Sequence, residues 1–161
     1  MGNVITLYMN RRDDEMPTIF ELAQAFLSFA PMSHKKLQKL CFYAQALYLA
    51  LNNEPLVDCD FQAWIHGPVC PELYGRYRHW GYREIPRAEM PENIRADEYI
   101  LNFINTIYDG FGFMSADKLE QLTHSESPWI EARAGLEEWE NSVNVIKRES
   151  MEQYYRIYLE D

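Results

Sequence analysis

The segment SHKKLQKLCFYAQALYLALNN, residues 33–53, constrains the fold more than any other part of the chain. Its apolar residues line one face of a predicted helix and then extend over much of the remaining helix surface: Leu37, Leu40, Cys41, Phe42, Tyr43, Ala44, Ala46, Leu47, Tyr48, Leu49 and Leu51. A helix that is apolar on nearly all sides is stable only when other elements surround it. The sequence therefore predicts a mainly α fold, a single compact helical domain with a central buried helix that begins after Ser33.

Shorter segments on both sides carry the signals of the helices that would surround this central one. Thr18 and Glu21 have the spacing of a capping box, and Pro31 should end the helix that they begin near Phe29, because proline cannot continue the hydrogen-bond ladder. The other segments with apolar residues at helical spacing are, in chain order, 71–80, 97–110, 115–122, 129–134 and 150–159.

The ends of three of these helices are also predicted. Gly81 is placed to close the helix over 71–80 in a left-handed conformation. Ser127, followed by proline, is expected to cap a helix whose Trp129 faces inward. Ser150 and Gln153 have the spacing of a second capping box, so the last helix is expected to begin there.

The segment FQAWIHGPVCPELY, residues 61–74, predicts a short β strand or hairpin element within this helical domain. Two sets of residues alternate from Phe61 to His66, which is typical of a strand with two unlike faces, and Gly67-Pro68 is expected to stop it. Tyr82–Arg95 contains prolines and has no periodicity, so it is predicted to be a long loop or a ragged hairpin.

Charge and length limit the classes of partner. The chain has 161 residues, enough for one domain, and a formal net charge of −10. An average surface of that sign repels a phosphate backbone, so no direct nucleic-acid partner is expected. A basic or apolar protein would instead be attracted, and the charge would speed the encounter.

Cysteine usage indicates the compartment. Cys41, Cys59 and Cys70 are an odd number without a close pair, which argues against a disulfide framework and for a reducing, cytoplasmic location. No apolar run is long enough to span a membrane, so no membrane partner is expected.

No metal site, cofactor or enzyme is expected from the recognised patterns. The cysteines and histidines lack the close pairs that structural zinc sites use, and the common nucleophile, phosphate and dinucleotide signatures are absent. The stretch from Thr123 to Glu126 contains acid and base types, but these are also helix-capping residues. His66 is expected to hold the Gly67-Pro68 corner through hydrogen bonds to the backbone.

Aromatic residues suggest a binding surface. Eleven Tyr and four Trp supply apolar area with a polar tip, the composition of interface anchors. Most should lie in the core, and the ones expected to be exposed are Trp64, Trp80 or Tyr82.

Three blocks in order, KLQKLCFYAQALYLALNNEPL (36–56), FQAWIHGPVCPELYGRYRHWG (61–81) and LEQLTHSESPWIEAR (119–133), resemble the Panacea domain, the SocA-like antitoxin and phage-associated protein family. The resemblance implies a mainly helical domain over residues 17–161 with an N-terminal arm over 1–16. It further implies an antitoxin of a bacterial or phage toxin-antitoxin system that neutralises a cognate toxin by direct protein binding, without catalysis. The family motif falls here on Lys39, Leu40, Tyr43, Gln45, Trp64, Gly67, Pro68, Tyr74, Thr123, His124, Pro128 and Trp129.

The sequence hypothesis is that a rigid corner displays a docking surface. The residues expected to bind the partner or to build this platform are Lys39, Tyr43, Gln45, Trp64, His66, Gly67, Pro68, Tyr74, Trp80, Thr123, His124 and Trp129. Two alternatives stay open. The chain would either be an adaptor that delivers the toxin to a Clp-type protease, as the resemblance allows, or an enzyme that disarms the toxin chemically with His66 or His124.

Overall fold

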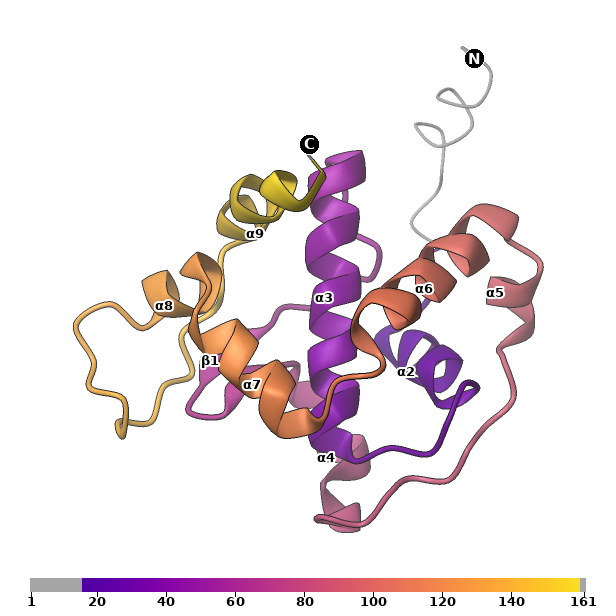
Figure 1. Ribbon diagram of the computed structural model, residues 1–161, viewed down its shortest axis with the longest axis horizontal. Coiled ribbons are helices and arrows are strands. Elements are labelled where there is room, and N and C mark those ends of the chain that lie inside the picture. Colours follow the sequence, from indigo (N-terminus) through magenta and orange to yellow (C-terminus); the bar gives the residue numbers. More distant parts are fainter. Residues whose placement is uncertain (1–15, 160–161) are drawn as a thin grey trace.

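The computed structural model describes residues 16–159, and over that range the chain is mainly helical, as predicted (Figure 1). Helix α3 (His34–Asn52) runs through the centre of the molecule. Every residue from Leu37 to Ala50 is buried, so neighbouring elements cover the apolar surface on all sides of this helix. The predicted N-terminal arm, residues 1–16, lies outside the described residues except for Met16.

The surrounding elements pack against α3 from several directions. They are α2 (Ile19–Leu27), α4 (Pro71–Tyr77), α5 (Glu92–Arg95), α6 (Glu98–Phe111), α7 (Ala116–His124), α8 (Ser127–Ala132), α9 (Arg148–Tyr155) and two 3-10 turns, η2 (Arg78–Trp80) and η3 (Arg156–Leu159). Figure 1 shows α2, α5 and α6 on one side of α3, with α8 and α9 on the other. Direct contacts join α3 to α2, α4, α6, α7 and α9. None of the helices in this range is long and apolar enough to cross a membrane.

The predicted helix starts near the N-terminus are confirmed. Thr18 and Glu21 form both halves of the capping box, with N–H···O distances of 2.9 and 3.1 Å. Ser33 caps α3 by accepting a hydrogen bond from the Lys36 amide at 3.2 Å. Such caps depend on side chains three residues apart, which is why local sequence is sufficient to find them.

The starts of α8 and α9 differ from the prediction. Ser127 lies inside α8 and Glu126 occupies the N-cap position, whereas α9 already begins at Arg148. Both hydroxyls donate to the Glu131 carboxylate instead of capping a helix: Ser127 at 2.7 Å from one turn earlier in α8, and Ser150 at 2.9 Å from α9. The Ser150–Glu131 hydrogen bond therefore ties α9 to α8.

The short β element is an antiparallel hairpin. Strands β1 (Gln62–Trp64) and β2 (Gly67–Val69) pair with Trp64 opposite Gly67 and Ala63 opposite Pro68, so the two-residue turn is Ile65-His66. The prediction that Gly67-Pro68 stops the strand is wrong, because these residues begin the second strand. Proline is tolerated there since β2 is an edge strand. The other edge of β1 is bound by segment 144–146, through Ala63 N–H to Asn144 O and Ile146 N–H to Phe61 O, both 2.8 Å.

The segment from Tyr82 to Arg95 is largely irregular, as predicted. One isolated bridge pairs Ile85 with Met32, and the short helix α5 at the end of the segment was not predicted. Gly81 closes η2 with a φ of +58°, which supports the predicted need for glycine, although its ψ of −126° lies outside the left-handed helical region.

Candidate functional site

The hairpin, α3 and α7 meet around Gly67. This glycine has a φ of +113°, and a Cβ atom added to it would lie 2.5 Å from Lys39 Cε and 3.1 Å from Thr123 Oγ1. Both the backbone conformation and the close approach of the two side chains therefore require glycine. Three residues of the predicted platform, from three elements, are brought together at this point.

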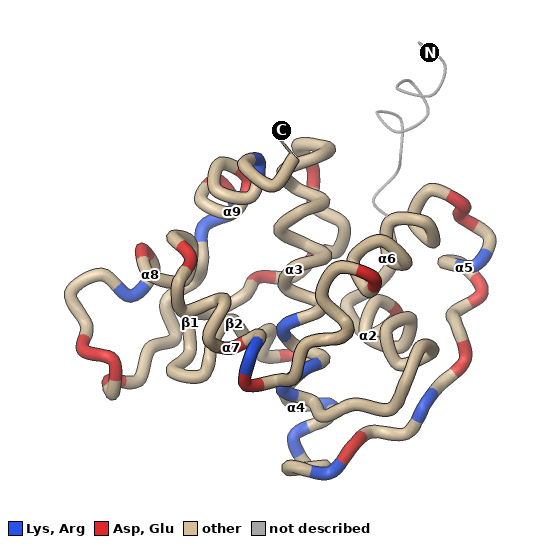
Figure 2. The backbone as a smooth tube through the Cα atoms, in the orientation of Figure 1, with Lys and Arg blue, Asp and Glu red and all other residues tan. Residues whose placement is uncertain are grey.

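A cavity of about 540 Å³ opens beside this junction. Its lining includes Lys35, Lys39, Trp64, His66, Tyr74 and Tyr82, so four residues of the predicted platform line it together with Lys35 and with Tyr82, which was expected to be exposed. Figure 2 shows that the basic residues of α3 lie toward the end of this helix near α4 and α7. Two lysines, Lys35 and Lys39, thus line one cavity of an acidic protein.

Lys39 is the unusual member of this set. Its side chain is 1% exposed, and it forms no hydrogen bond or ion pair with any residue in the range 16–159. Burial lowers the pKa of Lys39 to about 7, the positive charge of Lys35 acts in the same direction, and the Glu120 carboxylate opposes both. At neutral pH the amine is therefore close to half protonated.

Lys35 and His66 belong to a separate ionic group at the rim. Lys35 Nζ lies 2.5 Å from Glu120 Oε1 and 3.0 Å from Asp117 Oδ1. His66 Nδ1 lies 3.5 Å from Glu120 Oε2, and the His66 side chain is 74% exposed. Despite burial, the Lys35 and His66 partners lower the pKa of Glu120. The structure shows no His66 hydrogen bond to the corner backbone, so that prediction is wrong; the ring lies in the turn and faces the Glu120 carboxylate.

Aromatic rings of α4, α7 and α8 pack around the hairpin. Trp129 is buried, as predicted, and its Nε1–H donates to the Trp64 carbonyl at 2.9 Å. The His124 ring stacks on Trp129 with centroids 3.9 Å apart, and burial lowers the pKa of His124. Trp64 itself is half-buried and meets Tyr74 edge-on at 4.9 Å. The motif positions on α7 and α8 thus hold the strand that carries Trp64.

Three predicted site residues lie elsewhere. Tyr43 and Gln45 are fully buried in the core, so they contribute to the platform only through packing. Gln45 fixes the loop after α3, because its amide accepts from the Leu56 and Val57 backbone and donates to the Val57 carbonyl at 2.9 Å. Trp80 is half-buried on η2, whereas Tyr82 is 95% exposed.

Two buried polar side chains that fix the hairpin escaped the sequence reasoning. Gln38 exchanges two hydrogen bonds with the Cys70 backbone, at 2.9 and 3.0 Å, and so joins β2 to α3. Arg133 donates to the Ala63 carbonyl at 3.1 Å and to the Glu140 carbonyl at 2.6 Å, with its guanidinium 5.0 Å from the Trp129 ring centre. Their partners are backbone groups distant in the chain, which no local pattern reveals.

A second buried group unites residues from α3, α8, α9 and η3. Glu126 is 1% exposed and accepts hydrogen bonds from the hydroxyls of Tyr43 at 2.5 Å, Tyr155 at 2.9 Å and Tyr158 at 2.6 Å. Burial, followed by the nearby carboxylate, raises the pKa of Tyr43 and Tyr155. The tyrosines were visible as an apolar stripe, but the carboxylate that they share was not predicted.

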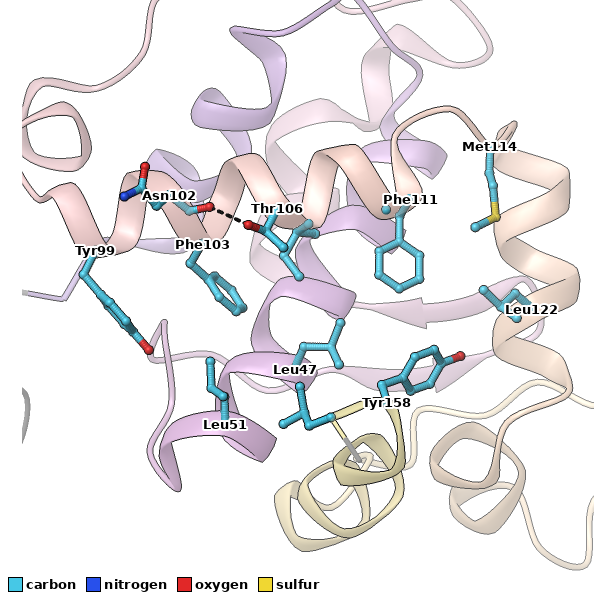
Figure 3. Close-up of a pocket in the computed structure, with 13 residues that line it drawn as sticks. Leu47, Leu51, Tyr99, Asn102, Phe103, Thr106, Phe111, Met114, Leu122 and Tyr158 are labelled. Atoms are coloured by element: carbon cyan, nitrogen blue, oxygen red, sulfur yellow. Dashed lines mark hydrogen bonds between the residues drawn. The ribbon is translucent and has the colours of Figure 1, made fainter. Parts of the chain in front are cut away.

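An apolar groove of about 730 Å³ was also missed. Figure 3 shows its walls, with Phe103 and Phe111 of α6 facing Leu47 and Leu51 of α3, and Tyr158 of η3 closing one end. The sequence feature that could have indicated the groove is Leu51, an apolar residue near the end of the central helix. In the structure its side chain is 48% exposed. The groove contains none of the family motif positions named above.

The donor sets in the described range do not gather as a metal site would require. Among residues 16–159, no group of three or more His, Cys, Asp or Glu side chains is arranged to hold a metal ion. Cys41, Cys59 and Cys70 are free and buried, and burial raises the pKa of Cys41. Cys41 packs in the core as a small apolar residue, whereas the Cys70 thiol donates to Glu72 Oε2 at 3.0 Å.

Comparison with known proteins places these observations in a family. The family described as "Antitoxin SocA-like, Panacea domain" matches residues 37–130, more than half of the chain. The protein Antitoxin SocA of Caulobacter vibrioides (strain NA1000 / CB15N) is 31% identical over 110 residues, which is 62% of this chain and 58% of SocA. The match thus spans little more than half the length of that relative, and no solved structure matches the chain significantly.

The matched range contains α3 from Leu37 onward, the hairpin, α4, α6, α7 and the Glu126 carboxylate. It therefore includes Lys39 and most of the cavity lining, but not Lys35, and the centre of the tyrosine cluster. The three sequence blocks that suggested the family lie within or across this range. The chain belongs to the Panacea domain family of SocA-like antitoxins.

Proposed function

We propose that this chain is an antitoxin that neutralises a cognate protein toxin by binding it directly, with residues 17–161 as the binding domain and without catalysis. The observation that carries this proposal is membership of a SocA-like antitoxin family together with the location of the motif residues. Of these, Lys39, Trp64 and Tyr74 line a single cavity on one face. The toxin-binding surface is assigned to this face.

The stiffness of the hairpin supports the assignment. Gln38 and Arg133 bond its backbone from two sides, and Trp129 bonds the carbonyl of Trp64. A surface that is already ordered loses little conformational entropy on binding, so more of the contact free energy remains as affinity. This rigidity suits a protein that has to hold a toxic partner tightly.

The chemistry of the face also suits a protein partner. Tyr82 is almost fully exposed and Trp64 is half-exposed, and such aromatic side chains are typical anchors of protein interfaces. A tight complex would bury about 1,600 Å² or more, which extends well beyond the cavity. The net charge of −10 would attract a toxin with a basic active site.

Co-expression in bacteria tests the proposal. The toxin candidate is the product of the gene that adjoins this one, and the wild-type chain should restore growth and co-purify with it. Trp64→Ala and Tyr82→Ala should weaken both effects, whereas Phe113→Ala, at a residue that is 80% exposed and outside the cavity lining, should not. Full rescue by both variants would overturn the assignment of the face.

A chemical mechanism is the second candidate, favoured by one observation. Lys39, with a pKa of about 7, lies near His66 and His124, and amines with lowered pKa values serve as bases or nucleophiles in enzymes. A His66→Gln/His124→Gln double variant that still binds the toxin but no longer protects cells would support this candidate. A toxin half-life that depends on both this chain and a Clp-type protease would instead support the adaptor.

A further inference from the structure

Lys39 is a buried cation without a counter-ion in the described part of the chain. Arg133, the other buried basic side chain there, donates to four backbone carbonyls. An unpaired buried ammonium is costly, and folded proteins normally satisfy such a group with an acceptor. No residue in the range 16–159 accepts a hydrogen bond from Lys39, and its side chain lines a cavity that opens to solvent.

The walls of the cavity suit a small ligand with an apolar body. Trp64, Val69, Tyr74 and Tyr82 surround the lysine, and the volume of about 540 Å³ lies within the range of small-molecule sites. Polar side chains, among them His34 and Gln38, also line the cavity, and a mainly apolar site with a few polar groups binds a ligand by its apolar stem and orients it by its head group. The head group has to accept a hydrogen bond from an amine.

The local charges indicate a monoanion. Lys35 also lines the cavity, but its charge is already compensated by Glu120 and Asp117. Lys39 therefore provides one positive charge that no carboxylate offsets within ion-pair distance, and no arginine lines the cavity. A dianion such as a phosphate monoester would retain one unpaired charge in this partly apolar site, whereas a carboxylate would be neutralised.

We infer that the cavity beside the hairpin is a carboxylate-binding site, in which Lys39 pairs with the carboxylate and Trp64, Val69 and Tyr74 contact its apolar stem. This inference rests on the proposed function: the carboxylate belongs to the toxin, as an acidic side chain or a C-terminus. A free small carboxylic acid is the other source of the same chemistry, and the experiment below distinguishes the two.

Binding should be linked to proton uptake. The amine has to be protonated to pair with the ligand, and the charged or titratable groups around it are His34 and Lys35 of α3, His66 of the hairpin turn, and Glu120 and His124 of α7. Burial lowers the pKa of His34 and of His124, so both are largely neutral where Lys39 titrates. Affinity should therefore fall as the pH rises above about 7.

The test uses the purified full chain and 3-phenylpropanoate as the probe, with 3-phenylpropanamide as its neutral isostere. Calorimetry and NMR titration should show carboxylate binding that perturbs Gly67 and Thr123, at least about tenfold weaker binding of the amide, and proton uptake on binding. Lys39→Met should lose the preference for the carboxylate, and Lys118→Met, at an exposed lysine of α7, should retain it. Equal affinity for acid and amide in the wild-type chain would overturn the inference without any variant.

The source of the carboxylate is decided by competition. If 3-phenylpropanoate displaces the toxin and Lys39→Met weakens toxin binding about tenfold or more, the toxin supplies the group. If the probe binds but does not compete with the toxin, the site is confirmed for a free carboxylic acid, and the claim that the toxin supplies the carboxylate is overturned. Probe failure with intact neutralisation refutes this site alone, whereas probe binding without neutralisation of any toxin refutes only the proposed function.

Discussion

Two buried residues of opposite charge, Glu126 and Lys39, lie in the same small core, but they differ in their hydrogen-bond partners. Each residue is 1% exposed. Glu126 accepts hydrogen bonds from three tyrosine hydroxyls, whereas Lys39 has no hydrogen-bond or ion-pair partner among residues 16–159. The Glu126 charge is compensated by hydrogen bonds within the fold, whereas Lys39 lines a cavity that opens to solvent.

In our proposal, Glu126 stabilises the fold, whereas Lys39 binds a ligand. Three charge-assisted hydrogen bonds offset the desolvation of a carboxylate, and they join α3 and α8 to the C-terminal elements. Lys39 has no such compensation, so its pKa falls instead. A protein that could have placed methionine at this position holds a lysine there, which is expected where a ligand provides the missing partner.

Removal of Glu126 gives the largest expected effect. Glu126→Ala leaves three phenol hydroxyls without their acceptor, two of them buried, and should lower the free energy of unfolding by about 3 kcal/mol. Urea denaturation measures this loss. Glu138→Ala, at an exposed carboxylate, is the matched control and should change stability by less than about 0.5 kcal/mol. Similar stability of both variants would contradict the structural role of Glu126.

Removal of Lys39 should instead change the pH dependence. The pKa of Lys39 is about 7 in the folded chain against an ordinary value of 10.5, so between these values the unfolded chain binds the extra proton. The contribution of Lys39 to the free energy of unfolding therefore rises with pH, by at most about 1.4 kcal/mol per pH unit. The penalty is fully present below pH 7.

Lys39→Met removes this contribution, so the variant should be more stable than the wild-type chain at pH 6, and that advantage should shrink steadily from pH 7 toward pH 10.5. Denaturation of both proteins at several pH values measures the difference between them. Lys118→Met should follow the wild-type curve. A Lys39→Met variant that is less stable by the same amount at every pH would show that the lysine is paired.

Two glycine substitutions test how closely the hairpin approaches α3 beside Lys39. Gly67→Ala forces a side chain into a φ of +113° and against Lys39, which should cost about 1–3 kcal/mol. Gly75→Ala, in α4 with open space around the new Cβ, should stabilise the chain by up to about 1 kcal/mol. Thermal unfolding compares the two. Equal effects would mean that the hairpin does not approach α3 as closely as described.

The smallest effects distinguish the partners of Glu126. Tyr155→Phe removes a hydroxyl that is buried with the carboxylate and should cost about 1 kcal/mol. Tyr158→Phe should cost less, because that residue is 49% exposed and water can replace its hydroxyl at Glu126 Oε2. Denaturant midpoints at a single pH resolve this order. A larger cost for Tyr158→Phe than for Tyr155→Phe would mean that the exposed hydroxyl contributes more to the cluster than the buried one.

The parts of the fold that depend on local sequence could be predicted, and the others could not. The central helix, the capping box at Thr18 and the helix after Ser33 follow from residues that lie within one or two turns of each other. The start of α9 was misplaced because Ser150 donates to Glu131 of α8, 19 residues away, instead of capping its own helix. Competition by a distant acceptor leaves no trace in a local pattern.

The site shows the same division. Gly67, Trp64 and Lys39 were predicted as site residues from the family resemblance, and nothing in the periodicity of α3 marks Lys39 as the one buried charge of that helix. The partners of Glu126 are 83, 29 and 32 residues away along the chain, which puts the cluster beyond any sequence motif. The apolar groove required knowledge of how α6 and η3 pack beside α3.

The most direct measurement is the titration of Lys39 itself, followed by NMR of the ¹³C-labelled Cε position in the wild-type chain, with Lys39→Met to assign the signal. Lys39 is expected to have a pKa of about 7 in the free protein, and this pKa should rise when 3-phenylpropanoate is bound. A pKa near 10.5 in the free protein, unchanged by the carboxylate, would show that the lysine already has its counter-ion and does not pair with the ligand.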